Sequence, residues 1–175
     1  MADKVYTSEE LAEWLFEKAS HEPAARARKI LMINEERGQS YTIVGKLYFF
    51  RYDPLWKNKL TQYDKFPMCF ALEEPNHSKN GYGFLGLNLH YLSGGARKAV
   101  IENFMLYASN KEMDETTRMR INYDLIKFMG KLHSVVKPAI HRYLFAHCRS
   151  HFIEVFPDEY DIAIQLPVEE WVFKR

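Results

Sequence analysis

The chain has 175 residues, of which 47% are hydrophobic and 27% charged, and this composition favours an ordered globular protein over a disordered chain. Cys69 and Cys148 lie far apart and outside any C-x-x-C pair, which argues against a zinc site or disulfide framework and predicts a reducing compartment. No apolar run approaches the length of a membrane span, and the opening residues, MADKVYTSEELAEW, are polar and acidic. Neither a membrane anchor nor a signal peptide is therefore predicted.

The formal net charge of +1 is unevenly distributed along the chain. Residues 118–149 carry seven basic side chains against Asp124 alone, a net charge of +6, whereas residues 150–171 carry six acidic side chains and no basic one. The two segments can pair with each other within one chain or between subunits, or they can leave the basic face free for phosphate.

Two helices are predicted near the N-terminus. A capping-box pattern formed by Thr7 and Glu10 begins the first, over residues 8–19. Pro23 suits the first turn of the second, which continues to Leu31 and ends before Gly38. We therefore expect a helical arm over residues 1–38, followed by an α+β core domain over residues 39–175.

Three strands are predicted next, over residues 41–52, 66–72 and 82–89, because these segments are rich in β-branched and aromatic residues. Gly45 marks a bulge or a point of close approach in the first strand. A polar loop, LWKNKLTQYDK, separates the first two strands, and a turn rich in Pro, Asn, His and Ser separates the second and third. The strands predict a small antiparallel meander, or an SH3-like barrel completed by a further strand.

The second half of the chain is predicted to supply the helices that flank this sheet. Ser93 is a plausible N-cap for a helix over residues 94–108, whose apolar face includes Val100 and Ile101. Further helices are expected over 116–129 and 138–147, then short strands over 152–156 and 161–166 around the turn at 157–159, and one helical turn over 167–171. The predicted fold class is α+β.

The sequence holds no strong signature of catalysis or of a cofactor. It lacks a P-loop, a Rossmann glycine fingerprint and a G-x-S-x-G motif, and its glycine-rich segment GYGFLG lies inside a predicted strand. His147 and His151 are four residues apart, but they lack the Glu of H-E-x-x-H and an obvious third ligand. We therefore predict no catalytic residue, metal or cofactor and disfavour an enzyme.

The basic residues are the better candidates for binding. Arg97 and Lys98 lie in the first turn of the 94–108 helix, where the dipole disfavours cations unless an anion is shared with the exposed amides. The candidate set for contacts to nucleic acid or to a neighbouring subunit consists of Arg97, Lys98, Lys127, Lys131, Lys137, Arg142 and Arg149. The alternative is that these side chains only solvate helix faces or pair with the acidic C-terminal segment.

Several segments of the core resemble a small virion protein of T-even-like and other contractile-tailed bacteriophages, whose members are usually labelled DNA end protector. They are GKLYFFRYDP at 45–54, LTQYDKFP at 60–67 and GFLGLNLHYL at 83–92, and the pattern at 143–170 is similar to the end of the same group. The resemblance covers roughly residue 45 to the C-terminus. Its structural signature is Gly45, Gly83, Gly86, Asn88 and His90.

The resemblance implies a non-enzymatic virion component that acts after DNA packaging. Such a protein shields the genome ends from host exonuclease at the portal or neck, as an oligomer among other virion proteins, with packaged double-stranded DNA as a further candidate partner. It is expected in the virion and, during assembly, in the host cytoplasm. The alternatives are a neck, tail or baseplate subunit making repeated protein contacts, and a small phage-encoded nuclease, which would need clustered acidic or histidine ligands.

Overall fold

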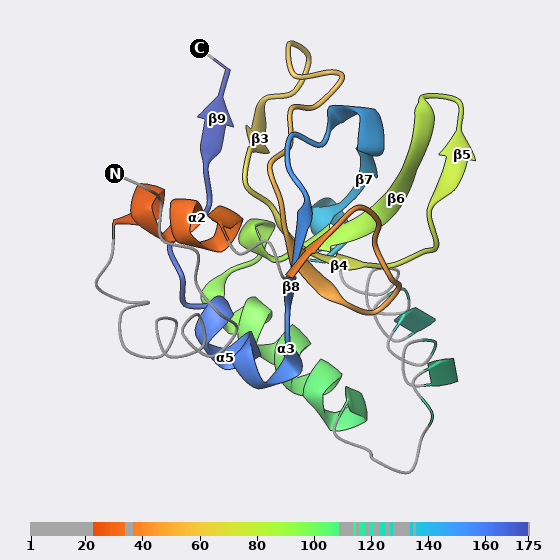
Figure 1. Cartoon of the computed structure of the whole chain (residues 1–175), viewed down its shortest axis with the longest axis vertical. Coiled ribbons are helices and arrows are strands. Elements are labelled where there is room, and N and C mark those ends of the chain that lie inside the picture. The colour runs from red at the N-terminus through yellow and green to blue at the C-terminus, as the bar shows by residue number, and fades with distance from the viewer. Residues whose placement is uncertain are drawn as a thin grey trace.

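The structure, a computed structural model, describes residues 23–33, 37–108, 114, 116–117, 120, 123–124, 127, 134 and 136–174. Within them an antiparallel sheet, a separate two-stranded ribbon and a group of helices form one body (Figure 1). The helix predicted over 8–19, most of the helix predicted over 116–129 and the candidate Lys131 lie outside the described residues. No helix in the described part is both long enough and apolar enough to cross a bilayer.

The main sheet is open and has the strand order β1-β8-β2-β4-β6-β5, with β7 paired to β6. All of its strand pairs are antiparallel. The strands are β1 (Gly38–Gln39), β2 (Leu47–Phe49), β4 (Met68–Ala71), β5 (Asn76–Ser78), β6 (Gly81–Asn88), β7 (Ile140–Leu144) and β8 (Phe152–Val155). The predicted α+β class and the predicted meander, β2-β4-β6, are confirmed. The alternative, an SH3-like barrel, does not fit, because the sheet is open.

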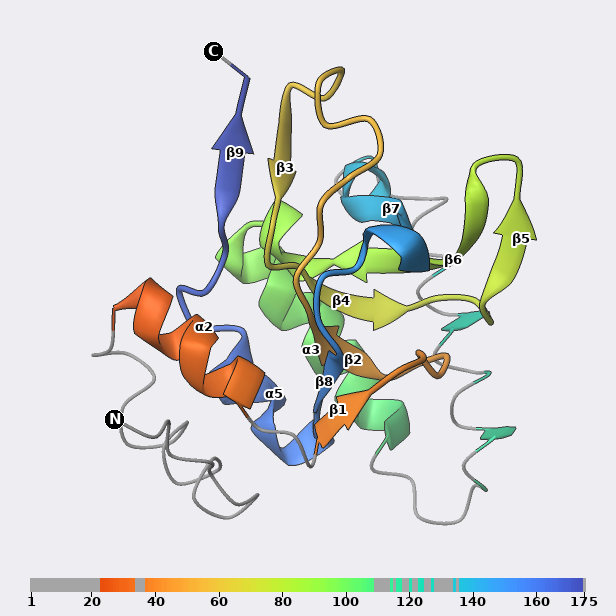
Figure 2. The ribbon, with the colours of Figure 1, turned by 45° about the horizontal axis from the view of Figure 1, so that its top comes forward.

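A second, two-stranded sheet joins two distant segments, β3 (Gln62–Asp64) and β9 (Trp171–Phe173). Figure 2 shows these strands side by side, near the C-terminus. β3 lies inside the segment that the sequence predicts as a polar loop, and the helical turn predicted over 167–171 is wrong because Trp171 begins a strand. Each strand has only three residues, so neither is recognisable without its partner.

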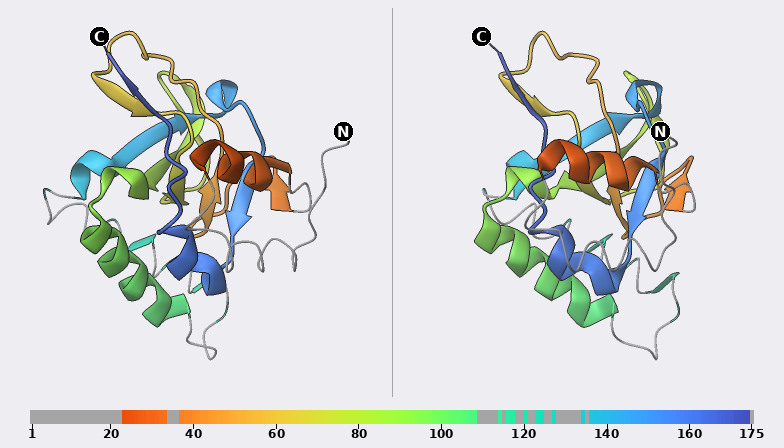
Figure 3. Two further views of the ribbon diagram at one scale, coloured as in Figure 1. Left: turned by 90° about the vertical axis from the view of Figure 1, so that its left-hand side faces the viewer. Right: turned by 60° about the vertical axis from the view of Figure 1, so that its left-hand side comes forward.

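The helices α2 (Ala24–Ile33), α3 (Gly94–Ala108) and α5 (Tyr160–Ala163) pack against the main sheet. Figure 3 shows α3 and α5 side by side below the sheet. The 94–108 helix is confirmed at both ends, and Ser93 Oγ accepts the amide of Ala96 at 3.4 Å as its N-cap. Short 3₁₀ turns complete the fold: η2 (Leu89–Tyr91), η3 (Lys137–Ala139), η4 (Phe145–His147) and η5 (Pro157–Glu159).

Two predicted elements have the wrong type. The helix expected over 138–147 is η3, β7 and η4, because residues 140–144 pair with five residues of β6 and so place Tyr143 in the core. The strand expected over 161–166 is instead α5, which buries Tyr160 and Ala163 at helical spacing on one face. In both places tertiary packing overrides the local pattern.

The sheet separates two clusters of buried side chains. Leu47 and Phe49 of β2 point into a mostly aliphatic core that also holds Ala27, Ile30 and Leu31 of α2. The alternate residues, Tyr48 and Phe50, point to the other face, since side chains alternate along a strand. There Phe50 lies 5.2 Å from the ring of Tyr143 and 4.9 Å from that of Phe152, measured between centroids. This aromatic face continues toward the loop that joins β2 to β3.

Candidate nucleic-acid interface

Exposed apolar side chains gather around the loop between β2 and β3 and on β9. Residues 55–60 are all exposed. Of the seven large hydrophobic side chains exposed in the described part of the chain, four lie here: Leu55, Trp56, Leu60 and Phe173, with Trp56 50% and Phe173 62% exposed. Exposed apolar groups that gather in one place mark a binding surface more often than isolated ones do.

A depression beside this loop is lined mainly by basic residues, and we call it the cationic trough. It is lined by Arg51, Tyr52, Asp53, Lys57, Tyr63, Lys65 and Arg149. Four of these residues are cationic, and Asp53 is the one carboxylate among them. Arg51 and Arg149 come from distant segments that meet where the Arg51 amide donates to Ser150 Oγ at 2.8 Å and the Arg149 amide donates to the Arg51 carbonyl at 2.8 Å.

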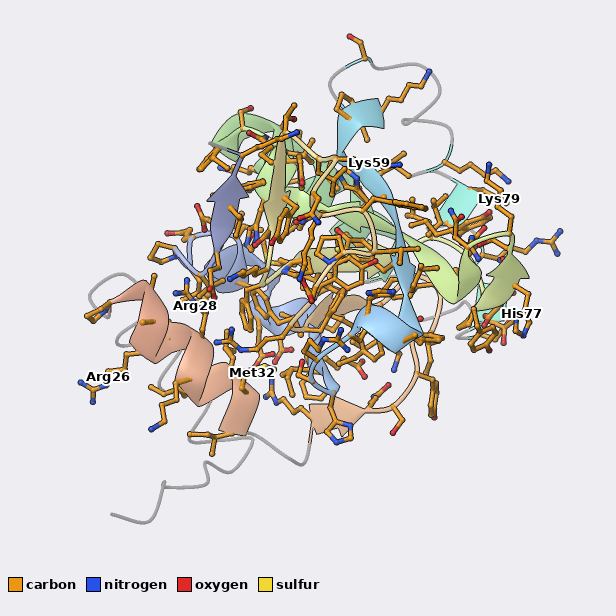
Figure 4. All side chains as sticks on the ribbon, turned by 90° about the horizontal axis from the view of Figure 1, so that it is seen from above. Arg26, Arg28, Met32, Lys59, His77 and Lys79 are labelled. Carbon is orange, nitrogen blue, oxygen red and sulfur yellow. The ribbon has the colours of Figure 1, made fainter. Side chains whose placement is uncertain are left out.

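The carboxylates near the trough neutralise only part of its charge. Lys57 Nζ lies 3.0 Å from Asp53 Oδ1, and Arg149 lies 3.7 Å from Asp53 Oδ2. The hydrogen bond from Lys57 holds the pKa of Asp53 below its usual value, so this carboxylate is ionised at neutral pH. Arg51 lies 3.3 Å from Glu170 Oε2, which also pairs with Arg28 of α2. Figure 4 shows Arg28 reaching from α2 toward the chain that leads into β9.

Lysines and aromatic rings alternate along the exposed loop itself. Lys59 Nζ lies 4.5 Å from the centroid of the Trp56 ring, within cation–π range. Seen from above in Figure 4, Lys59 lies on the side of the molecule that faces the viewer. A further depression between this loop and β9 includes Lys57, Tyr63, Phe173 and Lys174. The face therefore offers both positive charge and ring surface, the two features used to bind nucleic acid strands.

A third depression, the aromatic pocket, adjoins the trough. It encloses about 170 Å³ and is lined by Tyr52, Pro54, Leu55, Trp56, Leu60, Tyr63, Asp64, Asn80, Tyr91, His141, Arg142, Tyr143 and Leu144. Tyr52 and Tyr63 line both the pocket and the trough. Burial raises the pKa of Tyr52 and of Tyr91 to about 12, so both hydroxyls stay neutral at physiological pH. These rings therefore add no negative charge beside the trough.

Asp64, at the end of β3, holds this region together. Its Oδ1 accepts the amides of Phe66 at 2.9 Å and Glu170 at 3.0 Å, while its Oδ2 lies 3.3 Å from Asn88 Nδ2 and 2.6 Å from His90 Nδ1. Burial raises the pKa of Asp64, but the His90 contact and the two amides outweigh it and leave the pKa below its usual value. One buried carboxylate thus joins β3, the end of β6 and the start of β9.

The glycines of the signature permit close contacts. Gly45 has φ of +84°, a conformation that glycine adopts readily, and its amide donates to the Ala71 carbonyl at 2.8 Å. A Cβ on Gly83 would lie 2.9 Å from the Tyr143 carbonyl carbon, and one on Gly86 would lie 3.1 Å from the Tyr143 ring. In β6, Gly83 and Gly86 therefore let the backbone and the ring of Tyr143 pack close to the strand.

Two of the predicted binding residues make several intramolecular bonds. Arg97 donates to the backbone carbonyls of Leu92 at 3.1 Å and His90 at 3.2 Å. Arg142 donates to Glu73 Oε1 at 2.6 Å and to Asn76 Oδ1 at 2.6 Å, and it also lines the aromatic pocket. Their contact with DNA or a subunit stays a prediction.

The other candidates are spread over several elements. Lys98 is exposed on α3, 3.7 Å from Glu102, and Lys127 lies 5.1 Å from the ring of Tyr123. Lys137 is exposed in η3, and Arg149 lines the cationic trough. The structure thus brings Arg142 and Arg149 to adjoining cavities on one face and leaves Lys98 on a different element, α3.

The acidic C-terminal segment pairs with earlier parts of the chain. Glu154 lies 2.9 Å from Lys46, and Glu159 lies 2.6 Å from Arg37 in a buried pair. Arg142 and Arg149 pair instead with Glu73 and Asp53. The alternative in which the basic stretch pairs with the acidic one within the chain therefore does not describe these two arginines.

Sequence reasoning missed Arg51, Lys57, Lys59 and Lys65. The signal was present, because LWKNKL places lysines beside a tryptophan between two strands. It was not used because a polar loop usually indicates only solvent exposure.

The His147/His151 pair does not form the two-histidine helix face that a metal site would need. η4 ends at His147, whose Nδ1 lies 2.9 Å from the Asp53 carbonyl oxygen, and His151 is exposed beyond it. Across the described residues, no group of three or more His, Cys, Asp or Glu side chains could hold a metal ion.

Residues 34–175 match the model of a family described as phage T4 terminal DNA protecting protein. This span includes the main sheet, the β3–β9 ribbon and every residue of the trough and the pocket. Neither a curated protein nor a solved structure matches the chain.

Proposed function

The chain belongs to the phage T4 terminal DNA protecting protein family, and on that premise we propose that it binds the ends of linear duplex DNA through the cationic trough and shields them from exonucleases. The observation that carries the proposal is the gathering of Arg51, Lys57, Lys65 and Arg149 in one depression with Asp53 as its single lining carboxylate. Phosphate neutralisation by such cations supplies most of the sequence-independent affinity for DNA, which an end-binding protein needs on any genome.

Preference for an end requires more than charge, since charge alone binds every part of a duplex equally. The outer face of the terminal base pair is an exposed aromatic plane that the interior of a duplex does not present. Trp56 and Phe173, both at least half exposed beside the trough, offer rings that can stack on such a plane. Phosphates in the trough and rings on the terminal pair together would favour ends over interior sites.

We also propose that the protein acts as a non-enzymatic component of the virion, at the portal or neck, among other virion proteins and as an oligomer. Family membership supports a phage protein that protects DNA. A second role, as a neck, tail or baseplate subunit, is favoured by a separate observation: Tyr41, Tyr82 and Phe156 are exposed outside the trough and both adjoining cavities. Sedimentation of the purified protein tests the subunit role, which predicts assembly that Tyr82→Ser or Tyr41→Ser weakens.

Binding to a blunt linear duplex, measured at several salt concentrations, tests the DNA proposal. Log affinity should fall linearly with log salt, and each phosphate contact contributes about 0.9 to the slope. Lys57→Gln should lower the slope by about one. Lys98→Gln is a matched control, because both lysines are exposed and both pair with an acid four residues away, and it should leave the slope unchanged.

End preference is tested in the same assay with closed circular duplex as competitor. Circular DNA should displace the protein from linear DNA poorly, and bound protein should slow digestion of the linear duplex by an exonuclease. Equal competition by circular DNA would contradict end binding. A slope that falls for Lys98→Gln and not for Lys57→Gln would move the interface to α3, where Arg97 and Lys98 were the candidates from sequence.

A further inference from the structure

The aromatic pocket has the size and lining to hold a single ring system. Its volume of about 170 Å³ compares with about 150 Å³ for an engineered apolar cavity that binds benzene. Ring centroids lie 4.9 Å apart for Tyr52 and Tyr143 and 4.4 Å apart for Tyr91 and His141, so aromatic groups form much of the wall. A cavity of this size does not accommodate a base pair, whose width is that of two bases.

The histidine in the pocket wall is neutral at physiological pH, because burial lowers the pKa of His141. Its Nε2 is buried and makes no hydrogen bond to any described residue. His141 therefore adds aromatic surface to the wall without adding positive charge.

The pocket opens beside the place where phosphates are proposed to bind. Tyr52 and Tyr63 line both cavities, and Lys57 of the trough is adjacent in sequence to Trp56 of the pocket. In a nucleotide, the aromatic base and the phosphate are attached to the same sugar. An occupant that combines an aromatic ring with a neighbouring anion fits this pair of cavities by charge and by shape.

We propose that the aromatic pocket takes up the unpaired terminal base of a DNA strand while the cationic trough holds the phosphates that follow it. This proposal rests on the proposed function, since it names which part of the DNA end enters the protein. Capture of one frayed or overhanging base would anchor the protein at the end itself, because an interior base is stacked and paired and must be extruded at a cost of a few kcal/mol.

The test compares two DNA hairpins, each with a single duplex end and a one-nucleotide overhang, prepared with either 3′ or 5′ polarity. One overhang carries cytosine and the other is abasic, so they differ only in the base. The intact protein should bind the cytosine overhang of at least one polarity roughly 5- to 150-fold more tightly, the range expected of one base stacked on an aromatic side chain.

Variants assign the effect to the pocket. Trp56→Ala should bring the ratio of the two affinities close to one, and Trp56→Phe should restore most of it; Trp56 is 50% exposed, so neither change disturbs the core. Tyr41→Ala is the matched control, because Tyr41 is an exposed aromatic side chain outside the trough and both adjoining cavities, and it should leave the ratio unchanged.

Each result decides between the proposals. If the wild-type protein binds abasic and cytosine overhangs equally in both polarities, the pocket proposal is overturned, while salt-dependent end binding and the Lys57→Gln result still support the proposed function. The pocket proposal is also overturned if Tyr41→Ala lowers the ratio as much as Trp56→Ala does. Absence of binding to either hairpin overturns both proposals.

Discussion

Replacing Gly83 with alanine should separate β6 from β7. The added Cβ would lie 2.9 Å from the Tyr143 carbonyl carbon and 3.0 Å from Leu144 Cα, and closer still to the Tyr143 carbonyl oxygen. All three are backbone atoms of the paired strand, so no side-chain rotation relieves the overlap. Because β7 carries His141, Tyr143 and Leu144 to the pocket, the same shift should also disturb the proposed base site.

Overpacking in a well-packed interior costs typically about 1–3 kcal/mol, and a clash with backbone atoms belongs at the upper end. A loss of about 3 kcal/mol lowers the melting temperature of a domain of this size by roughly 6–12 °C. Thermal and urea unfolding of Gly83→Ala measure the change. Gly95→Ala is the control with the opposite expectation, because nothing lies within 4 Å of its added Cβ and alanine is favoured over glycine in a helix by about 0.5–1 kcal/mol. An unchanged midpoint for Gly83→Ala would refute the close approach of the two strands.

Two further predictions concern buried and half-buried charges. The pKa of Asp64 lies below its usual 3.8, so its contribution to stability is present above about pH 4 and is lost as the pH falls through the folded-state pKa. Asp64→Asn should cost about 1.5–3 kcal/mol in urea unfolding at pH 7, and its difference from wild type should shrink below pH 4; a difference that grows on acidification would contradict this. Arg142→Ala should lower stability by a similar 1.5–3 kcal/mol, because its guanidinium donates to Glu73 and Asn76. It should leave the salt slope of DNA binding unchanged, because Arg142 does not line the cationic trough; a slope lower by about one would instead make Arg142 a phosphate contact.

The structure gives the resemblance to DNA end protectors a physical basis in several of the signature residues. Asn88 and His90 bond to the buried Asp64, while Gly83 and Gly86 admit the backbone and ring of Tyr143. These residues do not themselves line the trough or the pocket. They hold in place residues that do, because Asp64 and Tyr143, which they contact, line the pocket. The proposed DNA contacts come instead from Arg51, Lys57, Lys65 and Arg149, which the fold brings together. A family signature can therefore mark the framework of a site without marking its contacts.

Elements with a complete local signal were predicted from sequence. Ser93, with its hydroxyl placed to accept the Ala96 amide, is sufficient to begin α3, and the residues of β6 alternate between the two cores in a period that only a strand produces. Segments whose state depends on a distant partner were predicted wrongly. Residues 140–144 have apolar side chains at helical spacing, yet they form β7 because pairing with β6 satisfies their backbone and buries Tyr143.

By itself the sequence determined the α+β class, the order of the central meander, the cap of α3 and the family, because each rests on residues that are close together in the chain. Only the tertiary structure decided which cations share a surface. Arg51 and Arg149 meet because their backbones and Ser150 hydrogen-bond across the end of the sheet, and β3 and β9 exist only as a pair. Contacts of this kind depend on how distant segments of the chain fold together. Hydrophobic burial on both faces of the sheet supplies the free energy for that folding, and the local sequence pattern does not encode it.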